Sequence, residues 1–91
     1  MKLINIYEFC NLSNKDEIGY KFIAKDDGIV FVLIKTRECG SYSLYSDNDN
    51  QSIFLGEDQL ALLSVSCQKD SEVVFSSNKV PREFQIYMVM S

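Results

Sequence analysis

The chain has 91 residues, of which 46% are apolar and 12% aromatic, and 13 acidic and 9 basic side chains give it a net charge of −4. This length predicts a single domain, residues 1–91, around one core. The hydrophobic content excludes intrinsic disorder, and the acidic balance disfavours binding to nucleic-acid phosphates. Because the chain has no histidine, it has no imidazole base, no Ser-His or Cys-His nucleophile pair and no histidine-containing zinc site.

The N-terminal stretch from residue 3 to residue 10 is ambiguous. A helix and a strand are equally compatible with the spacing of its apolar residues, Leu3, Ile6, Tyr7, Phe9 and Cys10. A polar, turn-prone segment follows at residues 11–17. One short N-terminal helix therefore stays open as an alternative to a strand.

Two strands are predicted next, at residues 18–25 and 29–34. The first alternates, with Tyr20 and Phe22 on one side and Lys21 on the other. The second is apolar without alternation and rich in β-branched residues, which predicts a central strand covered on both faces. Asp27-Gly28 lies between the two runs and predicts a hairpin, because both residue types tolerate the positive φ of a primed turn.

Further short strands are predicted at residues 41–46, 52–55, 60–67, 72–77 and 83–90, separated by turn-forming clusters. The single proline, Pro81, falls in one of the predicted loops, as its missing amide donor requires. The fold class is therefore mainly β: a single small antiparallel β-sandwich or barrel of about six to eight short strands. Five residues are assigned to its core: Phe22, Val30, Val32, Leu63 and Ile86.

The three cysteines, Cys10, Cys39 and Cys67, are odd in number, widely spaced and without a CxxC pair. This pattern indicates neither a disulfide framework nor a zinc site. The sequence also lacks a secretory leader pattern and an apolar run long enough to cross a membrane. We therefore expect free thiols and a cytoplasmic location.

A loop at residues 47–51 approximates calcium-ligand spacing, with Asp47 and Asp49 alternating and Asp58 at the twelfth position. Ser52 stands where the sharp turn of such a loop needs glycine, so an ordinary Asx-rich loop is the preferred interpretation. No catalytic residues, metal or cofactor are predicted.

Since no motif carries chemistry, the main hypothesis is a non-enzymatic protein-binding domain, such as an inhibitor, an immunity-type protein or an accessory subunit. It would act through an acidic, tyrosine-bearing surface or an exposed strand edge. The expected partner is a protein, and the acidic charge favours a basic one; copies of the chain itself are a second option, whereas nucleic acid and membrane are not expected. The predicted binding residues are Tyr45, Asp47, Asp49, Glu57 and Asp58.

The alternative hypothesis is a small-ligand or carbohydrate-binding β-sandwich module. Its binding surface would be a platform of tyrosine rings from the predicted strands, Tyr20, Tyr42, Tyr45 and Tyr87. This hypothesis requires a concave face lined by at least two exposed rings.

Overall fold

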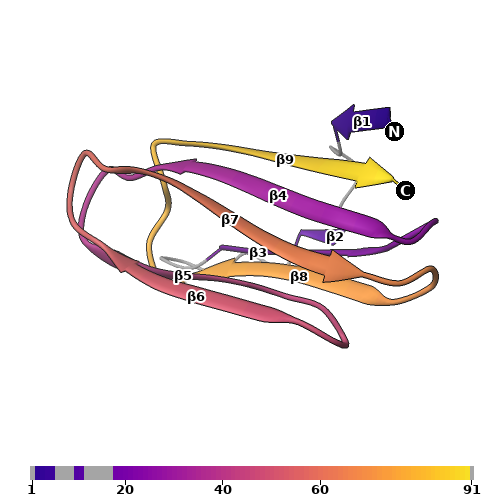
Figure 1. The fold of residues 1–91 in the computed structure, drawn as a ribbon. Helices are drawn as coiled ribbons and strands as arrows, with labels where there is room; N and C mark the ends of the chain where they lie inside the picture. Colours follow the sequence, from indigo (N-terminus) through magenta and orange to yellow (C-terminus); the bar gives the residue numbers. More distant parts are fainter. Residues whose placement is uncertain (1, 6–9, 12–17, 91) are drawn as a thin grey trace.

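The computed structural model describes residues 2–5, 10–11 and 18–90, and every regular element in these ranges is a β-strand (Figure 1). A four-stranded sheet has the order β1 (Lys2–Asn5), β9 (Glu83–Met90), β4 (Gly28–Lys35), β7 (Leu60–Cys67). A five-stranded sheet has the order β2 (Cys10–Asn11), β3 (Ile18–Ile23), β8 (Glu72–Ser77), β5 (Gly40–Tyr45), β6 (Asn50–Leu55). The described ranges contain no helix that could cross a membrane.

The two sheets pack face to face, and all strand pairs are antiparallel. Seven of the strands, β3 to β9, have six to eight residues each. The predicted small antiparallel β-sandwich is confirmed. The layered arrangement follows from the alternation of apolar side chains, which gives each sheet one face that must be covered.

The described part of the N-terminal stretch is extended rather than helical. β1 pairs with β9 and β2 pairs with β3, so the helical alternative is wrong for residues 2–5 and 10–11. Residues 6–9 lie outside the described ranges. Pairing with the last strand decides the conformation here, because the local apolar spacing fits both structures.

The core lies between the sheets and contains four of the five predicted residues. Val30, Val32, Leu63 and Ile86 are buried, and Phe22 is partly buried against them. The other members of this core cluster are Ala24, Ile34, Tyr42, Leu44, Leu55, Val65, Cys67, Val73, Phe75 and Met88. The face assignments made from alternation in these strands are therefore correct.

β4 is central in its sheet, between β9 and β7, but its outer face is less well covered than its buried inner face, with Phe31 and Leu33 half-buried there. On its outer face Ile29 is 44% exposed. The prediction that both faces would be covered is wrong. A run without alternation places apolar side chains on both sides of a strand, and here the outer ones join an apolar surface that includes Leu60 and Leu62 of β7.

The predicted hairpin between β3 and β4 is also wrong, because the two strands belong to different sheets. The connection between them binds the turn at 68–71: the N–H of Ala24 donates to the carbonyl of Ser71 (2.9 Å), and the N–H of Lys69 donates to Oδ1 of Asp27 (2.8 Å). No glycine in the described ranges has a positive φ, so Gly28 does not form the primed turn that a hairpin would need.

Cys39 and Cys67 are free thiols. Cys67 is buried and completes the inner face of β7, and this burial raises the pKa of its thiol. It acts there as a small apolar side chain rather than as a reactive group.

Candidate ligand-binding groove

The predicted binding residues fall into two groups at opposite ends of β6. Tyr45, Asp47 and Asp49 precede the strand, whereas Glu57 and Asp58 follow it. The six residues of β6 separate the groups by about 20 Å at the usual strand rise. All five are exposed, but the structure does not bring them into one site.

Asp49 has a structural role that the sequence did not suggest. Its carboxylate accepts hydrogen bonds from the N–H groups of Asn50 (2.8 Å) and Ser66 (3.0 Å). The bond from Ser66 is the main cause of a lowered pKa for the Asp49 carboxyl, and the bond from Asn50 adds to it. Nearby, Oε1 of Gln51 accepts the N–H of Ser64 (2.6 Å).

These contacts tie the β5–β6 hairpin to β7, which is the last strand of its sheet. The hydroxyl of Ser46 adds to them by donating to the carbonyl of Ser66 (2.7 Å). Unpaired N–H groups on an edge strand attract further strands. The side chains of Asp49 and Gln51 therefore cap this edge against additional pairing.

The turn at 56–59, which carries the second group of acidic residues, is held by a buried threonine. The hydroxyl of Thr36 donates to the carbonyl of Gly56 (2.7 Å) and accepts the N–H of Gln59 (2.8 Å). Asp58 adopts a left-handed backbone conformation, with φ of 53°, and pairs with Arg82 at 3.1 Å on the surface. This group therefore shapes a turn, and an exposed ion pair of this kind contributes little stability.

The tyrosines do not form the predicted platform. Tyr42 is 1% exposed and faces the core, and the half-buried ring of Tyr20 packs with its centroid 5.0 Å from that of Phe84. Tyr45 is exposed on the outer face of the five-stranded sheet, whereas Tyr87 is half-buried on the four-stranded sheet. The prediction of a platform is wrong because the parity of each strand sends these rings to different faces.

A groove of about 600 Å³ lies instead on the outer face of the five-stranded sheet. The residues lining it are Ser41, Tyr42, Ser43, Ser52, Ile53, Phe54, Ser76, Ser77 and Asn78. We call it the serine groove, because Ser43 pairs with Ser52 on one side and Ser76 on the other. These three serines form a row across β6, β5 and β8, and the hydroxyls of Ser43 and Ser76 are 2.8 Å apart.

Phe54 stands beside this row and is 70% exposed. It lies across from Ser41 in the strand register, and serine is too small to cover a phenyl ring. Sequence reasoning missed Phe54 as a functional candidate. The available signal was a phenylalanine that shares one face of a short strand with Asn50 and Ser52, since a large apolar side chain on a polar face is informative.

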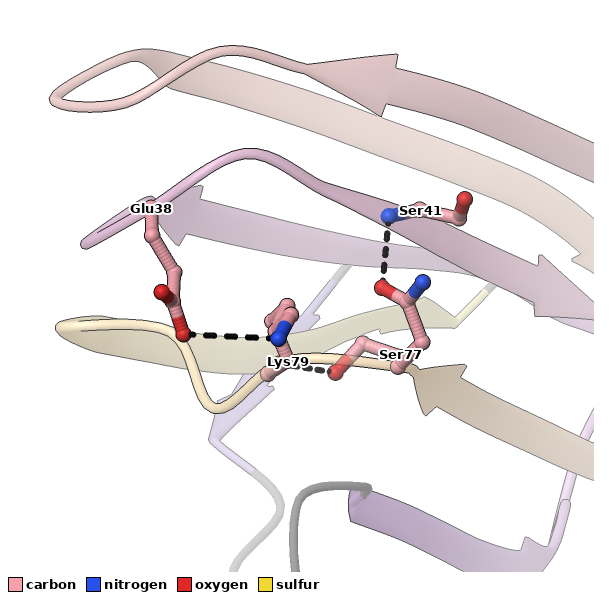
Figure 2. Close-up of polar contacts among 5 residues, drawn as sticks. Glu38, Ser41, Ser77 and Lys79 are labelled. Atoms are coloured by element: carbon pink, nitrogen blue, oxygen red, sulfur yellow. Dashed lines mark hydrogen bonds and ion pairs between the residues drawn. The ribbon is translucent and has the colours of Figure 1, made fainter.

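One end of the serine groove is formed by the loop between β8 and β9. Oδ1 of Asn78 accepts the N–H of Ser41 (2.8 Å), which fastens the loop to the start of β5 (Figure 2). Gly40 permits this approach, because a Cβ there would lie 3.0 Å from both Oδ1 of Asn78 and Cγ of Lys79. The end of the groove is therefore held in place without a ligand.

Two further contacts hold the same loop. The hydroxyl of Ser77 donates to the carbonyl of Lys79, and the ammonium of Lys79 lies 3.9 Å from the carboxylate of Glu38 (Figure 2). Because Glu38 belongs to the β4–β5 turn, the ion pair joins the two connections at this end of the sandwich.

The groove offers hydroxyls, an amide and an aromatic ring, and none of its nine lining residues carries a formal charge. The hydroxyl of Tyr42 stays protonated, since burial, followed by the nearby Glu38 and Cys39, raises its pKa. Among the residues that the structure describes, no cluster of three acidic, cysteine or histidine side chains could hold a metal. The chemistry available in the groove is hydrogen bonding and ring stacking.

No family model and no curated protein matches the sequence. A solved structure described as CBM35 from Cellvibrio japonicus Abf62 is similar with a TM-score of 0.55 and 13% identity, over 94% of this chain and 83% of that one. A ruminal GH26 endo-beta-1,4-mannanase is similar with a TM-score of 0.44 and 12% identity, over 84% of this chain but 18% of the mannanase. The first comparison shows that this chain shares the β-sandwich fold of a carbohydrate-binding module.

Proposed function

We propose that the protein is a non-catalytic module that binds carbohydrate in the serine groove. The observation that carries this proposal is the row of hydroxyls beside a phenyl ring that is 70% exposed, in a groove of about 600 Å³. The groove is within the size range of ligand pockets. The fold likeness to a carbohydrate-binding module supports carbohydrate binding over the protein-binding hypothesis. The single exposed ring of Phe54 takes the place of the predicted platform of two or more tyrosine rings.

Sugars and the serine groove have complementary chemistry. A pyranose ring carries hydroxyls on its edge and C–H groups on its faces. Serine hydroxyls both donate and accept hydrogen bonds, as sugar hydroxyls do, and the face of an aromatic ring attracts C–H groups through its electron density. Phe54 would therefore stack on a sugar face while the serines bind its edge.

Several polar groups of the groove are available to a ligand. Within the described residues, the hydroxyls of Ser41 and Ser52 and the Nδ2 amide of Asn78 have no hydrogen-bond partner. Ser41, Ser52 and Asn78 are all exposed, so these groups bond to water in the free protein. A sugar that replaces this water can satisfy them again without leaving buried groups unpaired.

The test is a binding titration with soluble oligosaccharides, comparing the parent with Phe54→Ala by isothermal calorimetry. We expect the substitution to weaken binding by about tenfold or more, because the loss of stacking on an aromatic side chain costs roughly 1–3 kcal/mol in the well-studied case of nucleic-acid bases. Leu62→Ala is the matched control, since Leu62 is also a highly exposed apolar residue (57%) but lies on the outer face of the four-stranded sheet.

The control should bind like the parent. If no neutral or acidic oligosaccharide binds the parent, or if Phe54→Ala binds as tightly as the parent, the proposal is wrong. Thermal unfolding of each variant would show that a loss of binding does not come from a loss of folding.

A second candidate function is protein binding at the edge of β6. This strand is the last of its sheet, and five of its six residues are exposed. Acidic residues flank both of its ends, with Asp47 and Asp49 on one side and Glu57 and Asp58 on the other. An extended basic peptide could therefore pair with the strand and be attracted by these carboxylates.

Nuclear magnetic resonance of labelled protein separates the two candidates. A lysine-rich extended peptide should shift the backbone amide signals of β6 and lose its effect at high salt. Shifts confined to the groove residues of β5 and β8, or none at all, would count against this second candidate.

A further inference from the structure

We infer that the serine groove selects uncharged oligosaccharides over those that carry carboxylate, sulfate or phosphate groups. This inference rests on the proposed function and specifies its ligand class. It comes from the charges in and around the groove, which differ from those of the chain as a whole.

The first observation is the absence of charge in the groove itself. Charged residues make up 24% of the chain, yet none lines the groove. A site for an anionic sugar needs a cation or a set of strong donors, because burying an uncompensated charge is costly. The serine groove provides neutral hydroxyls and one amide.

The second observation concerns two lysines of the described ranges, one that borders the groove and one that shares its face of the sheet. Lys79, in the loop that ends the groove, lies 3.9 Å from the carboxylate of Glu38. Lys21, on the outer face of β3, lies 3.0 Å from the carboxylate of Glu72. Each of these ammonium groups has an acidic partner, so neither supplies uncompensated positive charge. The net charge of −4 adds a general repulsion of anions.

The third observation is the hydroxyl pair at the floor. The oxygens of Ser43 and Ser76 are 2.8 Å apart, and either can be the donor. One of the two hydroxyls donates its proton to the other. The hydroxyl that accepts keeps its own proton free, and this proton can be donated to a ligand or turned away from it. The pair can therefore bind a sugar hydroxyl that acts either as a donor or as an acceptor of a hydrogen bond. An anionic oxygen only accepts hydrogen bonds, so it would use part of this capacity and lose its hydration.

The experiment compares ligands of equal length by isothermal calorimetry at low ionic strength. The neutral probes are cellohexaose, xylohexaose and mannohexaose, and the anionic probe is hexagalacturonic acid. We expect at least one neutral ligand to bind the parent about tenfold or more tightly than the anionic one, consistent with the uncompensated burial of charge. Binding of that neutral ligand should change little at about 0.5 M salt, since no charge is involved.

A charge variant sharpens the test. Ser52→Lys places an ammonium in the groove at an exposed position and should raise the affinity for hexagalacturonic acid severalfold. Leu62→Lys changes the net charge equally but on the opposite sheet, and it should leave that affinity close to the parent value.

The outcomes separate the inference from the function on which it rests. If hexagalacturonic acid binds the parent as tightly as the neutral ligands, and Phe54→Ala abolishes this binding, the inference is overturned while carbohydrate binding in the groove stands. If none of the four ligands binds, both are overturned. If Ser52→Lys and Leu62→Lys have the same effect, the selectivity comes from net charge and not from the groove.

Discussion

The six residues of β5 place different side chains on the two faces of the five-stranded sheet. The inner face holds Tyr42 and Leu44, which are buried, and the outer face holds Ser41 and Ser43, which line the serine groove. Successive side chains of a strand point to opposite sides, so one segment both stabilises the core and forms a candidate site. Substitutions on the two faces should therefore separate stability from binding.

The largest expected effect is on the inner face. Phe75 is 1% exposed and its ring stacks against Phe84 at a centroid distance of 5.7 Å. Phe75→Ala should lower the free energy of unfolding by about 3–5 kcal/mol, because it removes a large buried side chain and leaves a cavity. Phe54→Ala, on the outer face, should change it by less than about 0.5 kcal/mol. Urea denaturation of both variants checks the contrast, and equal losses would refute it.

A smaller effect of opposite sign is expected from Tyr42→Phe. The hydroxyl of Tyr42 is buried without a hydrogen-bond partner among the described residues. Removing it should raise the free energy of unfolding by about 1–2 kcal/mol, since an unsatisfied buried polar group is destabilising. Differential scanning calorimetry would detect the rise in Tm. A fall of similar size would mean that the hydroxyl has a partner, such as a buried water.

The contact between the start of β5 and the β8–β9 loop can be tested at Gly40. Gly40→Ala places a methyl group 3.0 Å from Asn78 and Lys79, so the β8–β9 loop must move away from β5. We expect a loss of about 1 kcal/mol in stability, as for mild overpacking, together with weaker ligand binding because the end of the groove shifts. Unchanged stability and affinity would show that the loop adapts freely and does not define the groove.

The smallest effect is expected at Asp49, which joins the β5–β6 hairpin to β7. Its carboxyl has a pKa below the ordinary value, because the ionised form accepts backbone hydrogen bonds in the folded state. Its contribution to stability is therefore present above the unfolded-state pKa of about 3.9 and is lost as the pH falls through the lower folded-state pKa.

Asp49→Asn should lower Tm slightly near pH 7, where the ionised carboxylate contributes to stability, and should make the loss of stability on acidification below about pH 4 shallower. Thermal unfolding across this pH range measures the difference. Asp47→Asn is the control, because no hydrogen bond of Asp47 is present among the described contacts. If Tm depends on pH in the same way in the two variants, the Asp49 carboxylate does not stabilise the edge of β7.

Local sequence patterns determined which segments are strands and which side chains share a face. The predicted ranges 60–67, 72–77 and 83–90 coincide with β7, β8 and β9, and the inward positions of Val32, Leu63 and Ile86 follow from alternation. These properties depend on residues close in the chain, where side-chain period and turn residues act directly.

Tertiary structure alone decided which strands pair and which residues are exposed. Asp27-Gly28 fits a hairpin locally, but β4 pairs with β7 and β9, and the connection pairs with a turn some 40 residues later. Similarly, Phe54 is exposed because β6 is an edge strand, and Tyr42 is buried because its side of β5 faces the other sheet. Alternation defines two faces of a strand, but the long-range packing of the sheets determines which face meets the core and which meets solvent.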